Sequence, residues 1–252
     1  MSARPDNIIS VQNLAVGYAG KAILQHLNFE VRRGEVFAIL GKTGSGKSTL
    51  LKNLIGLHTP LEGETLFEGR NLAATKGADR RRLLRSFGVL YQVGALFGSL
   101  TVLENVRLPL DAYDHLPKPA MDLVALSKLN LVDLKASAAK LPAELSGGML
   151  KRAALARAIV TDPGILFLDE PSAGLDPVTS AAMDALFKQL SRDAGITLVI
   201  VTHELSSIYA IADRVILLDA ERKSILAEGN PRDLRDNADD ASVRQFLRRE
   251  AP

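Results

Sequence analysis

Hydrophobic and polar residues alternate in the first part of the chain. The alternation is seen at Ile9 and Val11 and again from Leu27 to Val31, and it predicts strands that are buried on one face. The apolar run from Val36 to Leu40 is uninterrupted, which favours a short strand buried on both faces. The chain therefore begins mostly in β-structure.

The middle of the chain changes to helical spacing. Leucine and isoleucine recur at helical intervals from Ser48 to Leu57, and Pro60 and Gly63 are expected to end this helix. A short strand is predicted from Phe87 to Tyr91, and helices from Thr101 to about Leu134. These helices are predicted to break at three prolines, Pro109, Pro117 and Pro119.

Helices and strands then alternate toward the end of the chain. The helices are predicted at Gly147 to Val160, Pro177 to Asp193 and Glu204 to Ile211, and the strands at Ile165 to Leu168, Ile196 to Val201 and Val215 to Leu218. Such alternation predicts a parallel sheet with helices on its faces. The closing segment predicts a strand from Ile225 to Gly229, a helix that starts at Pro231, and an amphipathic helix around Val243 and Phe246.

The composition excludes several classes of protein. With 252 residues, of which 47% are hydrophobic and 24% charged, the chain can bury a sizeable core, so wholesale disorder is excluded. The absence of cysteine removes disulfides, thiolate metal sites and cysteine nucleophiles. No apolar run approaches the roughly 18 residues that a membrane helix needs, so we expect another chain to hold this one at any membrane.

The charge of the chain indicates no nucleic-acid partner. There are 31 Lys and Arg against 29 Asp and Glu, a net charge of +2. Arg80, Arg81, Arg82 and Arg85 fall on one short predicted helix, but such a cluster is more often a solvated face than a nucleic-acid patch. A footprint for nucleic acid would need Lys and Arg gathered more widely on one face.

A glycine-rich loop separates the strand that ends at Leu40 from the helix that begins at Ser48. Its residues match G-x-x-x-x-G-K-[ST] and are Gly41, Lys42, Thr43, Gly44, Ser45, Gly46, Lys47 and Ser48. Glycines let backbone N–H groups curl around phosphate oxygens, the lysine reaches the terminal phosphates, and the serine hydroxyl can ligate Mg²⁺. The alternative is a plain connecting turn, but the strand before it and the helix after it favour nucleotide binding.

Two carboxylates follow the apolar strand from Ile165 to Leu168. In open α/β sheets, ligands bind beyond the carboxyl ends of such strands. Asp169 is placed to hold Mg²⁺ through a water, and Glu170 can polarise the water that attacks the γ-phosphate. Alone, this pair is more often a turn or a helix cap; together with the phosphate loop it indicates hydrolysis.

A second glycine-rich segment opens the helix that starts near Gly147. In Leu145-Ser146-Gly147-Gly148-Met149, Ser146 is a natural N-cap, and the segment could equally be an ordinary capped helix. Because one nucleotide needs only one phosphate loop, a second anion-binding helix start suggests a nucleotide bound to another copy of the protein.

These motifs, in this order, resemble the ATP-binding subunit of an ABC transporter over nearly the whole chain. The resemblance implies an α/β fold of the P-loop NTPase class, with a RecA-like core, an amino-terminal antiparallel β subdomain and a helical subdomain. It implies a single ABC ATPase domain over residues 7–252. Within it, the β subdomain and core would take about 7–88 and 158–240, the helical subdomain about 89–157, and a carboxyl-terminal helix and tail 241–252.

The resemblance also implies ATP and Mg²⁺ as ligands and assigns residues to them. Tyr18 would stack on adenine, and the phosphate-binding segment would extend to Thr49. Gln92 would touch Mg²⁺ and link the nucleotide to the membrane partner, and Asp176 would follow the Gly-Leu pair of a loop near the nucleotide. His203 would contact the γ-phosphate. By themselves, Tyr18 and His203 would be ordinary loop and surface residues.

The signature of the family falls on Ser146 to Met149, with one departure. The usual signature ends in Gln, whereas Met149 neither donates nor accepts strongly, which puts in doubt any hydrogen bond from that side chain. The same Met, the stretch from Gln92 to Val102 and the late stretch from Val243 to Leu247 resemble the MlaF-type ATPases of Mla/MCE lipid transporters. That branch would act at the cytoplasmic face of the bacterial inner membrane, to maintain outer-membrane lipid asymmetry.

The branch implies a set of partners and a mechanism. The partners would be a second copy of the chain, an MlaE-like permease, an MCE-domain lipid-binding protein and a STAS-domain regulator of the MlaB type. Two copies would meet head to tail, with each ATP between Lys47, Ser48 and Asp169 of one copy and Ser146, Gly147 and Gly148 of the other. Leu96 and Phe97 would form part of a groove for the permease, or pack in the core.

Other functions stay open at this point. A soluble, non-transport ABC ATPase of the DNA-repair type would need a long coiled-coil insertion, and one linked to translation usually has two fused halves. A transporter of amino acids or metals, or one that releases lipoproteins, differs only in the weak signal of Gly94 to Val102 with Met149. A phosphotransferase would leave Ser146 to Gly148 and His203 without a purpose.

Overall fold

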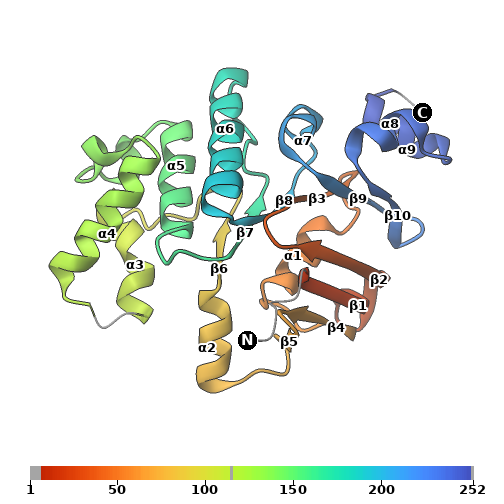
Figure 1. Ribbon diagram of the computed structural model, residues 1–252, viewed down its shortest axis with the longest axis horizontal. Coiled ribbons are helices and arrows are strands. Elements are labelled where there is room, and N and C mark those ends of the chain that lie inside the picture. The colour runs from red at the N-terminus through yellow and green to blue at the C-terminus, as the bar shows by residue number, and fades with distance from the viewer. Residues whose placement is uncertain (1–6, 114–115, 251–252) are drawn as a thin grey trace.

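The computed structural model describes residues 7–113 and 116–250 and contains two β-sheets. A four-stranded sheet and a six-stranded sheet are stacked, and the helices lie mainly on the outer side of the larger one (Figure 1). The predicted helical stretch from Thr101 to Leu134 includes residues 114–115, and the predicted tail includes 251–252; both pairs lie outside the described residues. The mixed α/β class predicted from the sequence is confirmed.

The smaller sheet is antiparallel and comes from the amino-terminal part of the chain. Its strands are β1 (Asn7–Tyr18), β2 (Lys21–Arg32), β4 (Glu62–Phe67) and β5 (Arg70–Asn71), in the order β2-β1-β4-β5. The alternating pattern from Leu27 to Val31 is confirmed, because Leu27, Phe29 and Val31 are buried on one face. The sequence did not predict β4 and β5, which are short and bury only Thr65 and Phe67, so no apolar alternation marks them.

The larger sheet is parallel except at one edge. Its strands are β3 (Val36–Gly41), β6 (Phe87–Leu90), β7 (Ile165–Asp169), β8 (Thr197–Val201), β9 (Arg214–Asp219) and β10 (Ser224–Gly229), in the order β10-β9-β3-β8-β7-β6. β10 pairs antiparallel with β9. Every residue of β3 and β8 is buried, as the uninterrupted apolar runs predicted.

Helices cover the parallel sheet and form one end of the molecule. They are α1 (Lys47–Leu54), α2 (Gly77–Arg85), α3 (Val102–Tyr113), α4 (Lys118–Leu131), α5 (Gly147–Ala158), α6 (Pro177–Ala194), α7 (Leu205–Ile211), α8 (Pro231–Asn237) and α9 (Ala241–Arg248). Two 3₁₀ turns, Lys135–Ser137 and Pro142–Glu144, lie between α4 and α5. Helices α3, α4 and α5 pack together beside the sheet (Figure 1). The predicted limits of the helical subdomain, at 88/89 and 157/158, fall inside β6 and α5 and stay a prediction.

The predicted break at Pro109 is wrong, because α3 runs through it. A proline inside a helix removes one backbone hydrogen bond and costs about 3 kcal/mol. The buried face of α3 offsets this cost, since Val102, Val106 and Leu110, at intervals of four residues, all lie in the core. Pro117 and Pro119 stand at the start of α4, where a proline is tolerated.

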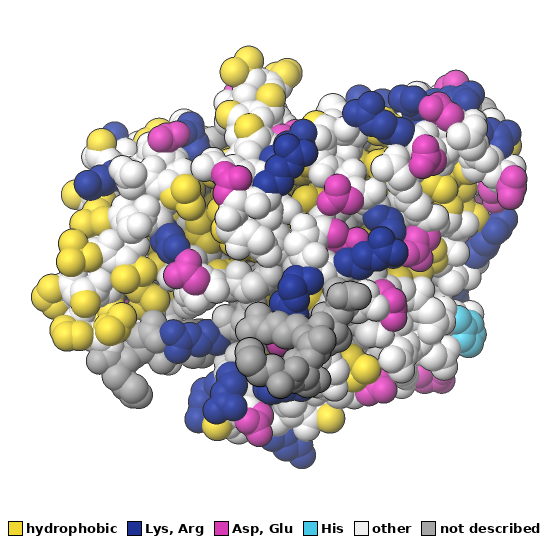
Figure 2. All heavy atoms as spheres, viewed as in Figure 1, with side chains coloured by type: hydrophobic (Ala, Val, Ile, Leu, Met, Phe, Trp, Pro, Cys, Tyr) yellow, Lys and Arg dark blue, Asp and Glu magenta, His cyan; other side chains and the backbone are white. Residues whose placement is uncertain are grey.

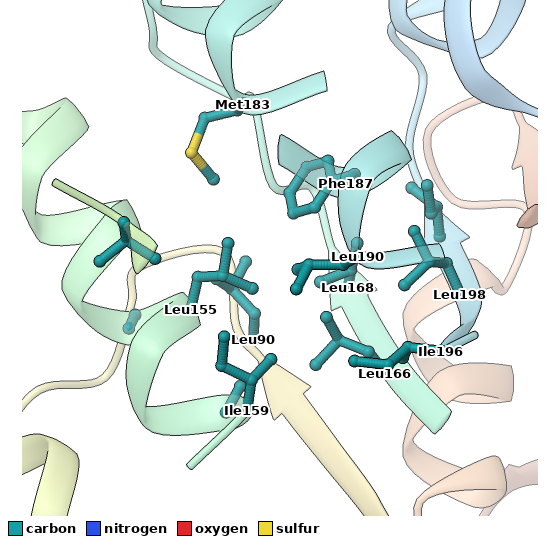
Figure 3. Packing of buried hydrophobic residues seen from close by; sticks show 14 of the residues in the cluster. Leu90, Leu155, Ile159, Leu166, Leu168, Met183, Phe187, Leu190, Ile196 and Leu198 are labelled. Atoms are coloured by element: carbon teal, nitrogen blue, oxygen red, sulfur yellow. The ribbon is translucent and has the colours of Figure 1, made fainter. Parts of the chain in front are cut away.

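Two hydrophobic clusters lie on the two faces of the parallel sheet. One cluster fills the space between the two sheets and includes Phe37, Phe67 and Phe167. The other packs α5 and α6 onto the opposite face, where Leu155 and Phe187 meet the strands (Figure 3). Because both faces are covered, the carboxyl-end edge of the sheet is where its loops can reach a ligand.

Candidate functional site

The residues predicted to be functional leave neighbouring parallel strands at one edge of the sheet. The glycine-rich loop follows β3, His203 follows β8, Asp169 and Glu170 end β7, and Gln92 follows β6. These four strands are adjacent and parallel, in the order β3-β8-β7-β6. Their carboxyl ends therefore meet at one edge, and the fold brings together residues that are up to 162 positions apart, from Gly41 to His203.

The loop between β3 and α1 curves into a cradle. Contacts and backbone angles within this chain require glycine at several of its positions. A Cβ on Gly41 would lie 2.3 Å from the Ser45 hydroxyl oxygen, and Gly44 and Gly46 have positive φ angles of 83° and 93°. Ser45 is 1% exposed, and its hydroxyl has no hydrogen-bond partner among the described residues. An orphaned hydroxyl beside a glycine cradle at a helix start fits a phosphate group.

Lys47 opens α1 and folds back over this loop. Its ammonium donates hydrogen bonds to the carbonyl oxygens of Gly41, at 2.7 Å, and Lys42, at 3.1 Å. Burial lowers the pKa of Lys47, and the charges of Glu170 and Asp169 act in the opposite direction. The amine therefore points into the cradle, where a phosphate oxygen could take the place of the carbonyls.

The Glu170 carboxylate is held by two neighbouring side chains. One oxygen accepts a hydrogen bond from the Thr202 hydroxyl at 3.0 Å, and the other lies 2.8 Å from Nδ1 of His203. Thr202 is buried, whereas the His203 ring is largely exposed. A carboxylate fixed in this way can orient a water, and His203 presents its other side to solvent. Sequence analysis missed Thr202, which no motif marks.

Asp169 stands beside Glu170 at the end of β7. Burial raises the pKa of Asp169, and the Glu170 carboxylate raises it further, while Lys52, Lys151 and Lys47 lower it. The neighbouring Glu170 carboxylate adds negative charge that favours a divalent cation, whereas the charges of the three lysines oppose one. Ser48 on α1 and Gln92 after β6 are exposed, so both side chains are free to reach a ligand.

Tyr18, the last residue of β1, lies next to the start of α1. Its hydroxyl is 3.5 Å from the Thr49 hydroxyl, and its ring meets the His58 ring edge-on at a centroid separation of 5.2 Å. The side chain is 44% exposed, so one face of the ring is open to solvent. The structure thus brings a stacking surface close to α1 from a strand of the other sheet.

The Ser146–Met149 segment starts α5 as a capped helix. The Ser146 side chain accepts a hydrogen bond from the Met149 N–H at 3.4 Å, while the Met149 side chain packs against the core. Gly147 is different: a Cβ there would point into open space, and its φ angle is not positive. Nothing in this chain therefore requires a glycine at position 147.

Asp176 has a local role as the N-cap of α6. Its carboxylate accepts hydrogen bonds from the backbone of Val178 and from the backbone and hydroxyl of Thr179. The hydrogen bonds from Thr179 and Val178 lower the pKa of Asp176. These contacts fix the loop that precedes α6.

The turn after Gln92 is held from behind by α5. Lys151 and Arg157 donate hydrogen bonds to backbone carbonyls of this turn, and the sequence analysis assigned neither of them. The signal was present: α5 is otherwise rich in buried alanine, so a lysine on its buried side is unusual.

Two regions of the surface expose apolar side chains. Val93 is 86% exposed and Phe97 54% exposed, whereas Leu96 packs partly against the core. Of the two alternatives for Leu96, a permease groove or the core, its partial burial favours packing against the core. The second region lies over α3 and α4 (Figure 2), where Leu116, Leu123 and Leu131 are exposed. No helix in the described parts of the chain has the length and apolar character of a membrane span.

Comparisons with known proteins give the same fold and the same family. The model of the ABC transporter family matches residues 24–173. The MlaF ATP-binding protein of an intermembrane phospholipid transport system from Haemophilus influenzae is 37% identical, over 97% of this chain and 92% of its own length. A probable ribonucleotide transport ATP-binding protein from Mycobacterium leprae is also 37% identical, over 95% of this chain and 68% of its own.

A solved structure extends the comparison to a nucleotide-bound cassette. It is a dimeric ATP-binding cassette in a post-hydrolysis state, bound to ADP and Pi. It superimposes with a TM-score of 0.79 at 30% identity, over 88% of this chain and 98% of the other. The chain therefore belongs to the ABC transporter family, as an ATP-binding subunit that hydrolyses ATP.

Proposed function

We propose that this chain binds ATP with Mg²⁺ at the edge formed by β3, β8, β7 and β6. The observation that carries the proposal is the cradle, in which Ser45 is orphaned and the Lys47 amine points inward. Backbone N–H groups from Gly41 to Thr49 hold the phosphates, and Tyr18 stacks on the adenine ring. Ser48, Gln92 and, through a water, Asp169 hold Mg²⁺, which supplies positive charge against the phosphates when bound.

Glu170 is the base that orients the attacking water. Its carboxylate is fixed by Thr202 and His203, so it needs no large rearrangement to accept a proton. His203 contacts the γ-phosphate through the ring edge that faces solvent in the single chain. Binding of the nucleotide to Gln92 would shift the turn that follows this residue.

Two copies of the chain complete each site head to tail. Gly147 supports this arrangement, because an unrequired, exposed glycine at a helix start suits the close approach of a ligand from outside the chain. Ser146, Gly147 and Gly148 of one copy then meet the γ-phosphate bound by the other, and Asp176 lies at the contact. The γ-phosphate favours the closed pair, and its hydrolysis removes those contacts and favours opening.

The transporter moves phospholipid at the bacterial inner membrane, with this chain on the cytoplasmic face. The names of the MlaF relatives support this cargo, and the Mycobacterium leprae relative supports ribonucleotide transport as the second candidate. The exposed Val93 and Phe97, on the turn after Gln92, support contact with an MlaE-like permease. That permease would link the chain to an MCE-domain lipid-binding protein.

The exposed leucines on α4 and just before it suit a further protein at the helical end. Leu116, Leu123 and Leu131 form no part of the nucleotide site, and a STAS-domain regulator is the partner that we propose for them. Substituting Leu123, at 69% exposure, with Glu should release such a regulator without changing the ATPase activity of the isolated chain.

Affinity purification tests the transport function. The tagged chain is recovered from detergent-solubilised membranes of its host, and the proteins and lipids that accompany it are identified by mass spectrometry. We expect an MlaE-like permease, an MCE-domain protein and phospholipid. A different permease would overturn the phospholipid cargo, and the absence of any permease would overturn the transport assignment in favour of a soluble ATPase.

A further inference from the structure

One buried lysine touches two parts of the proposed site. Lys151 on α5 is 7% exposed. Its ammonium donates hydrogen bonds to the backbone carbonyl oxygen of Gln92 and, at 3.2 Å, to that of Glu170. Gln92 and Glu170 come from different strands, β6 and β7, so a single side chain joins two loops at the edge of the sheet.

The backbone of Glu170 is held by hydrogen bonds on both sides of its Cα, and Lys151 makes one of them. Its φ angle is 46°, in the left-handed region that residues with a side chain rarely adopt unless their surroundings fix them. The Glu170 N–H donates to the Val201 carbonyl at 2.8 Å, and the Glu170 carbonyl accepts from the Ala173 N–H and from the Lys151 ammonium, each at 3.2 Å. The peptide groups on both sides of the Glu170 Cα are thus anchored, which sets the direction of its carboxylate.

The turn after Gln92 is anchored to the same helix. Arg157, also on α5, donates to the carbonyl oxygens of Gly94, at 2.8 Å, and Ala95, at 2.7 Å. With the bond from Lys151 to Gln92, three carbonyls of this turn are bound to α5, while the side chains of Gln92 and Val93 stay exposed. A displacement of the turn would therefore move α5 or break these bonds.

We propose that Lys151 is a positioning residue for ATP hydrolysis, because it holds the backbones of Gln92 and Glu170 at one separation. The proposal rests on the proposed function, since it concerns the same site. The Lys151 ammonium contacts the backbone carbonyl oxygens of Gln92 and Glu170 and not their side chains. It therefore orients the Glu170 carboxylate through the backbone, without touching the nucleotide. A movement of the turn after Gln92 reaches Glu170 through this one ammonium group.

The test is a set of three substitutions measured in the full-length chain. Lys151→Met keeps an unbranched side chain that is one atom shorter and removes its donors, and we expect kcat for ATP to fall about 10- to 100-fold. The KM for ATP should stay within about twofold, because the contacts of Lys47 and Tyr18 are untouched. Lys151→Arg presents two donors to the two carbonyls and should recover most of the loss in kcat.

Arg152→Met is the matched control. Arg152 is the next residue on α5, and its side chain has no hydrogen bond or ion pair within residues 7–113 and 116–250. The control loses the same charge and should keep the wild-type kcat. Amide hydrogen exchange over residues 92–95 supplies a readout apart from activity: we expect faster exchange in Lys151→Met and no change in Arg152→Met.

The outcomes separate this inference from the proposed function. If the wild type hydrolyses ATP and Glu170→Gln does not, but Lys151→Met keeps the wild-type kcat, only the role of Lys151 is overturned. A Lys151→Met chain that fails to fold, or a Lys151→Arg chain as inactive as Lys151→Met, would make Lys151 a structural residue. If the wild type itself hydrolyses no ATP, the proposed function fails.

Discussion

Two glycine-rich segments open helices in this chain, and they differ in what requires their glycines. In the loop from Gly41 to Ser48, the chain itself requires them, since a Cβ on Gly41 would collide with Ser45 and Gly46 has a positive φ angle. In the Ser146–Met149 segment, a Cβ on Gly148 would lie 2.8 Å from the Thr179 methyl carbon, whereas a Cβ on Gly147 would meet no atom, and the φ angle of Gly147 is not positive. The first segment therefore forms a complete phosphate-binding loop within one chain. In the second segment, Gly147 is explained only by the nucleotide of a second copy that docks on it.

The largest expected effect comes from removing Glu170, the general base, which lies with the Gly41–Ser48 loop in the same chain. Glu170→Gln keeps the shape of the side chain and abolishes its ability to accept a proton. We expect ATP turnover to fall about 10²- to 10⁴-fold, while ATP-driven dimerisation persists because the contacts with phosphate remain. Steady-state phosphate release and light scattering with ATP measure the two effects. Wild-type turnover in this variant would contradict the role of Glu170.

The same substitution in the two segments tests the comparison directly. Gly41→Val should lower the stability of the chain by about 1–3 kcal/mol or more, because the new side chain meets Ser45 and the Leu218 carbonyl. Gly147→Val should leave the Tm of the isolated chain almost unchanged and abolish ATP-driven dimerisation. Thermal unfolding and light scattering in the Glu170→Gln background check both. A loss of Tm at position 147 as large as at position 41 would remove the distinction.

A smaller effect is expected at Tyr18, whose ring is proposed to stack on the adenine of ATP. Tyr18→Ala should weaken ATP binding by roughly 1–3 kcal/mol, which is about 5- to 150-fold, whereas Tyr18→Phe should bind almost as the wild type does. The reason is that stacking uses the ring and not the hydroxyl, whose contact with Thr49 is long, at 3.5 Å. Titration of the Glu170→Gln background with ATP measures the affinity. An equal loss in both variants would point to the hydroxyl.

The smallest effect concerns Asp184, a buried carboxylate outside the site. Burial raises its pKa as it does that of Asp169, so the two can be compared. The charge of Lys188 acts on the pKa of Asp184 in the opposite direction. The folded chain then holds this proton more tightly than the unfolded chain, so stability falls as pH rises above the ordinary value of 3.8. Asp184→Asn should raise Tm by about 2–4 °C at pH 7 and by less near pH 4. A rise that is independent of pH would contradict this assignment.

The sequence predicted the elements whose pattern is set by burial and by motifs. The strands β3, β7 and β8 were predicted because each is an uninterrupted apolar run. The strands β4 and β5 were not, because they are short, only Thr65 and Phe67 among their residues are buried, and the pairing of β4 with β1 is a tertiary contact. The break at Pro109 was predicted wrongly because local propensity cannot register the buried face of α3.

The candidate site divides in the same way. Gly41 to Ser48, Asp169 and Glu170 could be found from residue type and spacing alone. Thr202, Lys151 and Arg157 could not, because they act on backbone groups and on a carboxylate that are near them only in the folded chain. Their roles depend on β6, β7 and β8 being neighbours, which a pattern along the chain does not state.

Mixing two inactive variants tests the central claim that each site is built from two copies. Lys47→Ala removes the phosphate side of the site, and Gly147→Val blocks the segment that the partner copy supplies. In a mixed head-to-tail pair, one site combines the intact loop of one copy with the intact Gly147 of the other. We expect the mixture to hydrolyse ATP well above the sum of the two variants alone. A mixture no more active than that sum would mean that one chain holds the whole site.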